Sequence, residues 1–250
     1  MSGHSKWANI KHKKEAADKV KGKAFSRIGK EIMVAAKNGG GDPNANPSLR
    51  AALTAAKAVN MPNANIERAI KKGLGELGDV TFEEIVYEGY AAGGVAVLVD
   101  CLTDNRNRSI SEVRMVFDRN GGNLAGSGAV ARMFSRQAHF VISGEWADED
   151  KLMDIVLDAG AEDLIVEDGV AEIWAAPDAF EEIAKVLEAN GIPTEEAEVT
   201  RRPEMTVNLT DAKVAGQVMR LLDKMEELDD VQRVTANYEI DDSIADQIEE

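Results

Sequence analysis

Residues 163–175 read Asp-Leu-Ile-Val-Glu-Asp-Gly-Val-Ala-Glu-Ile-Trp-Ala, and this stretch decides how the surrounding region folds. Two runs rich in β-branched and aromatic residues, 163–167 and 170–175, flank the dipeptide Asp168-Gly169. Asp-Gly between two such runs is typical of a tight turn in an antiparallel hairpin. The stretch therefore predicts two adjacent strands joined by a short turn.

The segments on both sides of this hairpin complete a recognisable order. A strand pattern at 138–143 and a helix pattern ending at Gly160 come before it, and a helix pattern ending at Gly191 and a strand at 196–201 follow it. The order βαββαβ is that of the ferredoxin-like fold. We expect residues 138–202 to form such a domain.

The region before this domain reads as half of another α/β unit. Strand patterns at 82–88 and 94–102 precede a helix predicted to open at Ser109, where Ser109-Ile-Ser-Glu112 fits a capping box. A strand at 129–134 would complete the unit.

The region after it reads as a second half. A strand at 205–209, a helix at 211–227 and a strand at 231–238 have no partner of their own. Because the ends of an inserted domain lie close together, the two halves can join. We expect one discontinuous domain of residues 79–137 plus 203–250, with the 138–202 domain inserted in it.

The first 78 residues are predicted to be helical. Apolar residues recur at helical spacing in three segments. The first ends at Asn38–Gly41, the second covers 48–61, and the third ends at a glycine-rich hinge, residues 73–78. Residues 6–23 are too polar to bury much surface and suggest an extended arm or a loosely held helix. The whole chain is therefore predicted to be α+β, with an N-terminal three-helix domain followed by two ferredoxin-like α/β domains, one inserted in the other.

Charge is divided unevenly between these regions. Residues 1–78 contain 15 Lys and Arg against 6 Asp and Glu, a net charge of +9, while the rest contains 14 against 39, a net charge of −25. A basic domain on an acidic body can bind a polyanion although the chain as a whole is acidic. The single cysteine, Cys101, excludes a disulfide framework, and the longest apolar runs are too short to span a bilayer. These features predict a cytoplasmic protein with no membrane partner.

The basic region is the strongest candidate site. Lysines supply mobile positive charge for phosphates, and an indole can stack on an unpaired base. The structural alternative is a solvated charged segment with Trp7 packed against it. The residues predicted to contact nucleic acid are Lys6, Trp7, Lys11, His12, Lys13, Lys14, Lys21, Lys23, Arg27, Arg68, Lys71 and Lys72.

A candidate anion site follows the predicted strand 94–102. Arg106, Arg108 and Ser109 stand at a helix start, where backbone N–H groups and guanidinium groups could bind an anion. The alternative is that these residues cap the helix and pair with the many carboxylates. The three histidines have neither metal-ligand spacing nor a neighbouring nucleophile, so we predict no enzyme activity, no metal and no cofactor.

Several long motifs resemble the YebC/PmpR family, in the same order along nearly the whole chain. They are Gly3-His-Ser-Lys-Trp-Ala-Asn9, Ala35-Ala36 with Gly40-Gly-Asp-Pro43 and Leu49-Arg50, Met61-Pro62 with Asn65-Ile-Glu-Arg-Ala-Ile-Lys-Lys-Gly73, Tyr87-Glu-Gly-Tyr90, Cys101-Leu-Thr-Asp-Asn-Arg-Asn-Arg108, Glu112-Val-Arg114 and Asn120-Gly-Gly-Asn-Leu124. The resemblance implies three domains, one inserted in another. The sequence departs from the family pattern at Ala91-Ala92, at Arg132 and at Arg201-Arg202-Pro203, and the arginines add positive charge there.

The resemblance implies a regulator of gene expression and no known enzyme. Members are described as DNA-binding transcriptional regulators, as a mitochondrial translational activator, or as factors for ribosomes stalled on proline-rich sequences. We expect nucleic acid as the partner, DNA or ribosomal RNA, with protein partners on the acidic domains and an oligomeric state that the sequence leaves open. A DNA-binding transcriptional regulator is the first interpretation, and a ribosome-associated translation factor is the alternative. No paired sheet aromatics of an RNA-recognition motif stand out.

Overall fold

The computed structural model describes residues 17–78, 81–167, 169–241, 243–244 and 247, with the side chains of residues 17–22 left out. Contacts divide the chain into two compact units. Among the described residues, one contains 131–208 and 237–240, and the other contains 17–130, 209–236, 241, 243–244 and 247. Each unit is described by itself.

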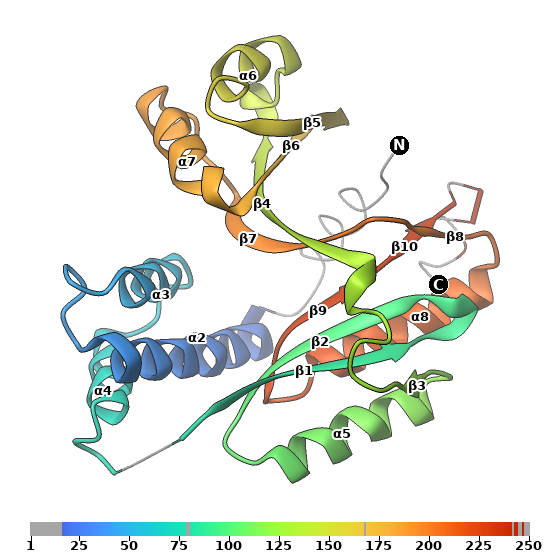
Figure 1. Cartoon of the computed structure of the whole chain (residues 1–250), viewed down its shortest axis with the longest axis horizontal. Helices are drawn as coiled ribbons and strands as arrows, with labels where there is room; N and C mark the ends of the chain where they lie inside the picture. Colours follow the sequence, from blue (N-terminus) through green and yellow to red (C-terminus); the bar gives the residue numbers. More distant parts are fainter. Residues whose placement is uncertain (1–16, 79–80, 168, 242, 245–246, 248–250) are drawn as a thin grey trace. The chain divides into compact units, whose positions relative to one another are not determined.

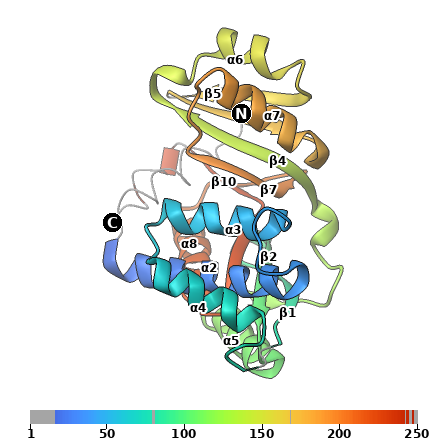
Figure 2. The ribbon, with the colours of Figure 1, turned by 90° about the vertical axis from the view of Figure 1, so that its left-hand side faces the viewer.

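The N-terminal domain consists of α2 (Ala17–Gly39), α3 (Pro47–Ala58) and α4 (Asn63–Gly73), as the glycine and proline signals predict (Figures 1 and 2). Asn46 caps α3, since its side-chain oxygen accepts a hydrogen bond from the N–H of Leu49 at 3.0 Å. Ile32 and Leu49 are fully buried in the small core between the helices. At Gly73, a Cβ would lie 2.3 Å from the carbonyl oxygen of Met33, so a glycine lets α4 approach α2 closely.

The first sheet joins segments far apart in the sequence. Its order is β3 (Asn123–Leu124), β1 (Glu83–Tyr90), β2 (Ala96–Thr103) and β9 (Val231–Ala236). The segment after residue 203 adds a strand to the sheet that begins with β1, since β9 pairs antiparallel with β2. Two helices, α5 (Arg106–Arg119) and α8 (Ala212–Glu226), contact each other and this sheet (Figure 1).

The second sheet is ferredoxin-like, as predicted. Its strands are β4 (Phe134–Ser143), β5 (Ala161–Glu167), β6 (Val170–Ala175) and β7 (Glu196–Pro203), arranged β5-β6-β4-β7 with every pair antiparallel. Helices α6 (Glu149–Val156) and α7 (Phe180–Ala189) cover one face of it (Figure 2). Fully buried Phe140 and Ile173 contribute to the core beneath them. Short 3-10 turns cover 92–94, 131–133, 144–146 and 177–179.

Three predicted boundaries are wrong. Residues 129–134 do not form a strand of their own, because β4 runs unbroken from Phe134 to Ser143 after a 3-10 turn. The helix predicted at Ser109 begins at Arg106, since Asn105 provides the cap. The strand predicted over 231–238 ends at Ala236, and β10 (Tyr238–Ile240) pairs with β8 (Val207–Leu209) in a separate two-stranded sheet.

Candidate nucleic-acid interface

Two of the predicted contact residues on α2 bind the end of another helix. Lys23 and Arg27 are four residues apart and share a face of α2. The Nζ of Lys23 donates to the carbonyl oxygen of Glu226 at 3.0 Å, and Nη2 of Arg27 donates to the same oxygen at 2.9 Å. Glu226 is the last residue of α8, where carbonyl groups lack helical partners and the helix dipole favours cations. Part of the positive charge predicted for nucleic acid therefore caps α8.

One turn further along α2, Lys30 forms an ion pair with a buried carboxylate. Asp230, whose side chain is 4% exposed, accepts hydrogen bonds from Lys30 Nζ at 2.8 Å, Arg108 Nη2 at 2.7 Å and Thr103 Oγ1 at 2.8 Å. Burial raises the pKa of Asp230, but these three donors outweigh burial and hold the pKa below its ordinary value. The cluster links α2, β2 and α5 around the residue that precedes β9.

The same carboxylate engages the predicted anion site. Hydrogen bonds to Asp230 and to Asp104, which lies 2.8 Å from Arg108 Nη2, raise the pKa of Arg108 above its ordinary value. Two carboxylates therefore engage this guanidinium, and its binding of an external anion stays a prediction. Ser109 is buried within α5, and its hydroxyl has no hydrogen-bond partner among the described residues. Arg106 is exposed at the start of α5, and its binding of an anion stays a prediction.

The remaining predicted cations that the structure describes lie on α4. Ile66 and Ala69 bury one face of this helix, which leaves Arg68 and Lys71 exposed and Lys72 partly exposed. Spacings of three and four residues place the three cations on neighbouring positions of the helix surface. Among the described residues, no hydrogen bond or ion pair engages their charged groups.

The basic segment before α2 lies outside the described residues. This applies to Lys6, Trp7, Lys11, His12, Lys13 and Lys14, and to the side chain of Lys21. Their contact with nucleic acid stays a prediction. In the described part of the chain, no group of three or more His, Cys, Asp or Glu side chains could hold a metal ion, and no helix is long and apolar enough to cross a membrane.

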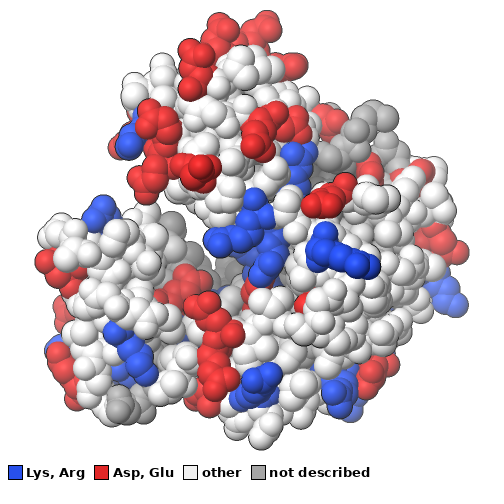
Figure 3. Space-filling model, in the orientation of Figure 1, with Lys and Arg blue, Asp and Glu red and all other residues white. Residues whose placement is uncertain are grey.

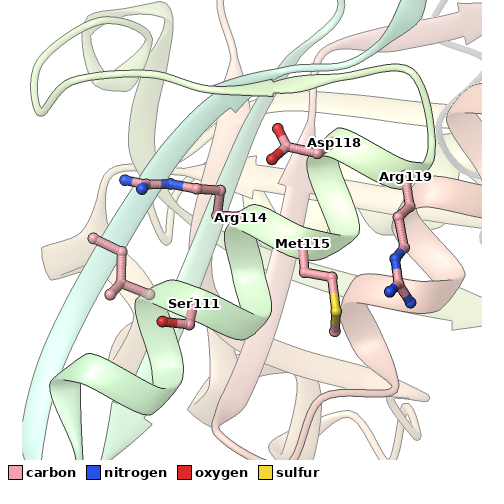
Figure 4. Close-up of a pocket in the computed structure, with 6 residues that line it drawn as sticks. Ser111, Arg114, Met115, Asp118 and Arg119 are labelled. Atoms are coloured by element: carbon pink, nitrogen blue, oxygen red, sulfur yellow. The ribbon is translucent and has the colours of Figure 1, made fainter.

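A shallow hollow of about 350 Å³ lies along α5 and is lined by that helix alone (Figure 4). Arg114, Asp118 and Arg119 give it mixed charge, and Met115 is exposed beside them. Ligand sites are usually concave and enclosed by several elements. The hollow is therefore a surface feature of the helix.

Sequence reasoning missed an aromatic cluster on the face of the second sheet opposite α6 and α7. The rings of His139 and Trp174 stack with centroids 3.9 Å apart, and the guanidinium of Arg202 lies 4.8 Å from the Trp174 ring centroid. His139 also contacts Glu172 at 3.2 Å. Cross-strand register brings these side chains together, so only the strand pairing could have revealed them. Since Trp174 is only 7% exposed, the cluster offers little surface for a base to stack on.

Comparison with known proteins follows the same domain divisions. The family model described as the TACO1/YebC protein N-terminal domain matches residues 5–76, and the model described as the TACO1/YebC second and third domain matches residues 82–238. Together they cover the helical domain and both four-stranded sheets.

Similar proteins extend over the full length. A "Probable transcriptional regulatory protein" of Syntrophobacter fumaroxidans is 54% identical over 99% of this chain and 100% of its own length, and one of Halothermothrix orenii is 50% identical over the whole of both chains. The crystal structure of a conserved hypothetical protein from Aquifex aeolicus matches with a TM-score of 0.86 and 48% identity, covering 96% of this chain and 99% of the other. The three-helix domain, the two sheets and these full-length matches together show that the chain belongs to the TACO1/YebC family.

Proposed function

We propose that this protein regulates gene expression by binding the phosphate backbone of nucleic acid through its basic N-terminal domain, and that its principal target is DNA. The name shared by the relatives, "Probable transcriptional regulatory protein", supports a role in transcription. The proposal assigns the protein no catalytic step and no cofactor.

The observation that carries the proposal is the cationic surface of α4. Lys23, Arg27 and Lys30 of α2 bind groups within the protein, whereas the charged groups of the α4 cations have no partner in the described chain. Part of their role is to complement the α4 dipole, because Lys71 and Lys72 occupy its last turn. A dipole alone does not need three cations side by side, and phosphates are the ligand that suits them.

The test is a titration of labelled duplex DNA and structured RNA at several salt concentrations. Each lost phosphate contact lowers the slope of log K against log salt by about 0.9 for duplex DNA, so the triple variant R68Q/K71Q/K72Q should lose up to about 2.7. Lys57 is a matched control, because it is an exposed cation in the last turn of α3. K57Q should change the slope by less than one contact, and an unchanged slope in the triple variant would refute the proposal.

Crosslinking in cells identifies the target. Recovery of discrete promoter fragments is the result expected for a transcriptional regulator. Recovery of ribosomal RNA instead would overturn the choice of DNA and assign the protein to translation. Because phosphate contacts carry no sequence information, DNA binding in vitro alone does not select between the two outcomes.

A further inference from the structure

A second hollow, of about 330 Å³, lies in the ferredoxin-like domain beside α6. Three separate parts of the chain supply its apolar lining: the turn before α6 with Trp146, α6 itself with Leu152 and Ile155, and the segment after α7 with Ile192. Leu152 and Ile192 also belong to the buried core, so this α6 hollow borders the core of the domain. Because several elements enclose it, the α6 hollow meets a condition for a binding site that the hollow along α5 does not.

Trp146 is the exposed aromatic side chain of the α6 hollow. It is 40% exposed, and among the described residues no group accepts a hydrogen bond from its indole N–H. A tight turn positions it, since Gly144 has a φ of +70° and its carbonyl oxygen accepts a hydrogen bond from the N–H of Ala147 at 3.1 Å. Tryptophan is enriched among the residues that contribute most to binding at protein interfaces. An apolar side chain of a partner can therefore pack against this indole and the aliphatic side chains beside it.

The polar groups that line the α6 hollow leave one unpaired charge. The Nζ of Lys151 lies 3.3 Å from the carboxylate of Asp148, and Nδ2 of Asn190 donates to the carbonyl oxygen of Val186 at 2.8 Å. Glu145 is exposed, and no ion pair or hydrogen bond with a described residue engages its carboxylate. A small polar ligand is oriented by several converging polar groups. A single carboxylate beside an apolar hollow suits instead an apolar side chain with a cation next to it.

The surface around the α6 hollow is strongly acidic. Residues 145–158 contain six Asp and Glu against one Lys, and residues 131–208 contain 19 Asp and Glu against 6 Lys and Arg. In Figure 3, Asp and Glu outnumber Lys and Arg over the part of the molecule where Figure 1 places α6 and α7. Such a surface repels nucleic acid and attracts a cationic segment.

We propose that the α6 hollow docks a lysine-rich segment of a partner protein, which inserts one apolar side chain against Trp146. The apolar lining supplies affinity, and the acidic surroundings select a positively charged segment and accelerate its association. The inference goes beyond the proposed function and does not depend on it, because the proposed function places the nucleic acid on the N-terminal domain.

The test measures binding of a fluorescent lysine-rich peptide with one central leucine to the full chain, by fluorescence anisotropy. W146A should weaken binding at least about 10-fold, because truncating an interface anchor commonly has an effect of this size. Met153 is a matched control, since it is 38% exposed in the same domain and does not line the hollow. M153A should change the affinity by less than about 2-fold. Circular dichroism of each variant checks that the fold is intact.

A second pair of variants tests the charge without removing the tryptophan. E145K should weaken binding about 3- to 10-fold, and this effect should shrink at high salt. Glu204 is the matched control, because it is exposed and its N–H donates to the carbonyl oxygen of Met133, just before β4. The ten residues of β4 separate it from the hollow by roughly 30 Å, which exceeds the Debye length of about 8 Å. E204K should therefore change the affinity by less than about 2-fold.

Several results would overturn the proposal. If the same peptide with serine in place of leucine binds equally well, only charge is recognised and the apolar hollow is refuted. If a glutamate-rich peptide with the central leucine binds as tightly, the assignment to a cationic partner is wrong. If W146A is no more harmful than M153A, or E145K no more harmful than E204K, the hollow is not the docking site.

Two further measurements identify the occupant and separate this inference from the proposed function. If analytical ultracentrifugation shows a dimer that W146A dissociates, the occupant is a second copy of this chain and the assignment to a partner protein is overturned. W146A should leave the salt slope for duplex DNA unchanged, because the hollow does not contact nucleic acid. A loss of peptide binding with an intact DNA slope supports the docking site, whereas an equal loss of both would refute it.

Discussion

Replacing Asp230 with Asn removes the charge that holds Lys30 and Arg108, while the side chain keeps its size. Breaking a buried ion pair from one side costs about 3–5 kcal/mol, and one hydrogen bond to a charged group contributes about 1.5–3 kcal/mol. Arg108 retains Asp104 and is 44% exposed, and Lys30 retains the carbonyl oxygens of Asp229 at 2.9 Å and Leu102 at 3.3 Å. These remaining partners reduce the cost, so we expect D230N to lower the free energy of unfolding by about 2–3 kcal/mol.

Urea unfolding followed by circular dichroism measures this loss, and the neighbouring Asp229 provides the control. Asp229 is exposed and offers Lys30 only its backbone carbonyl, so D229N should change stability by less than about 0.5 kcal/mol. A double-mutant cycle with K30M isolates the Lys30–Asp230 term, which should exceed about 1 kcal/mol. If D230N is no more destabilising than D229N, the carboxylate does not stabilise the contact between α2 and β9.

The pH dependence gives an independent check of the same reasoning. The folded-state pKa of Asp230 lies below its ordinary value, so its contribution is present above the unfolded pKa of about 3.9 and is lost as pH falls through the folded value. The stability difference between the unaltered protein and D230N should therefore be full at pH 6–7 and should shrink below about pH 4. A difference that stayed constant down to pH 2 would contradict an ionised Asp230 as its source.

Two further predictions concern packing in the compact unit that contains the helical domain and the first sheet. Burial raises the pKa of Cys101 to about 12, so the native thiol should react with a disulfide reagent at pH 8 at least roughly a thousandfold more slowly than after unfolding in urea, and equal rates would contradict its burial. Gly73→Ala places a Cβ against the Met33 carbonyl and should destabilise the protein by about 1–3 kcal/mol. Gly216→Ala has no atom within 4 Å of the new Cβ and should stabilise α8 by about 0.5–1 kcal/mol. Thermal unfolding compares the two variants, and a destabilising Gly216→Ala would refute the packing argument.

Element positions could be predicted where local signals were unambiguous. Asn38–Gly41 ended α2, and Asp168-Gly169 separated β5 from β6. The start of α5 was misplaced because Ser109 and Glu112 have the spacing of a capping box, yet Asn105 comes first and its side chain accepts from the N–H of Arg108 at 3.1 Å. Two candidate caps four residues apart cannot be ranked from sequence, because only the structure shows that Ser109 is buried within α5 and that Asn105 caps it.

The candidate site was less predictable, because charge patterns do not reveal long-range partners. Lys23 and Arg27 looked like any other cations in the basic region, but their acceptor is about 200 residues away at Glu226. The pairing of Arg136 with Arg201 depends on β-sheet register in the same way. Only the fold shows which cations are engaged inside the protein.

This distinction changes what the basic N-terminal region can be expected to do. Its net charge of +9 overstates the surface available to a polyanion, because Lys23, Arg27 and Lys30 bind α8 and Asp230. The cations of α4 have no partner among the described residues and are suited to phosphate. Affinity should therefore be strongly salt-dependent and weakly sequence-dependent. Target selection must then come from the shape of the nucleic acid or from a protein bound to the acidic domains, since phosphate contacts carry no sequence information.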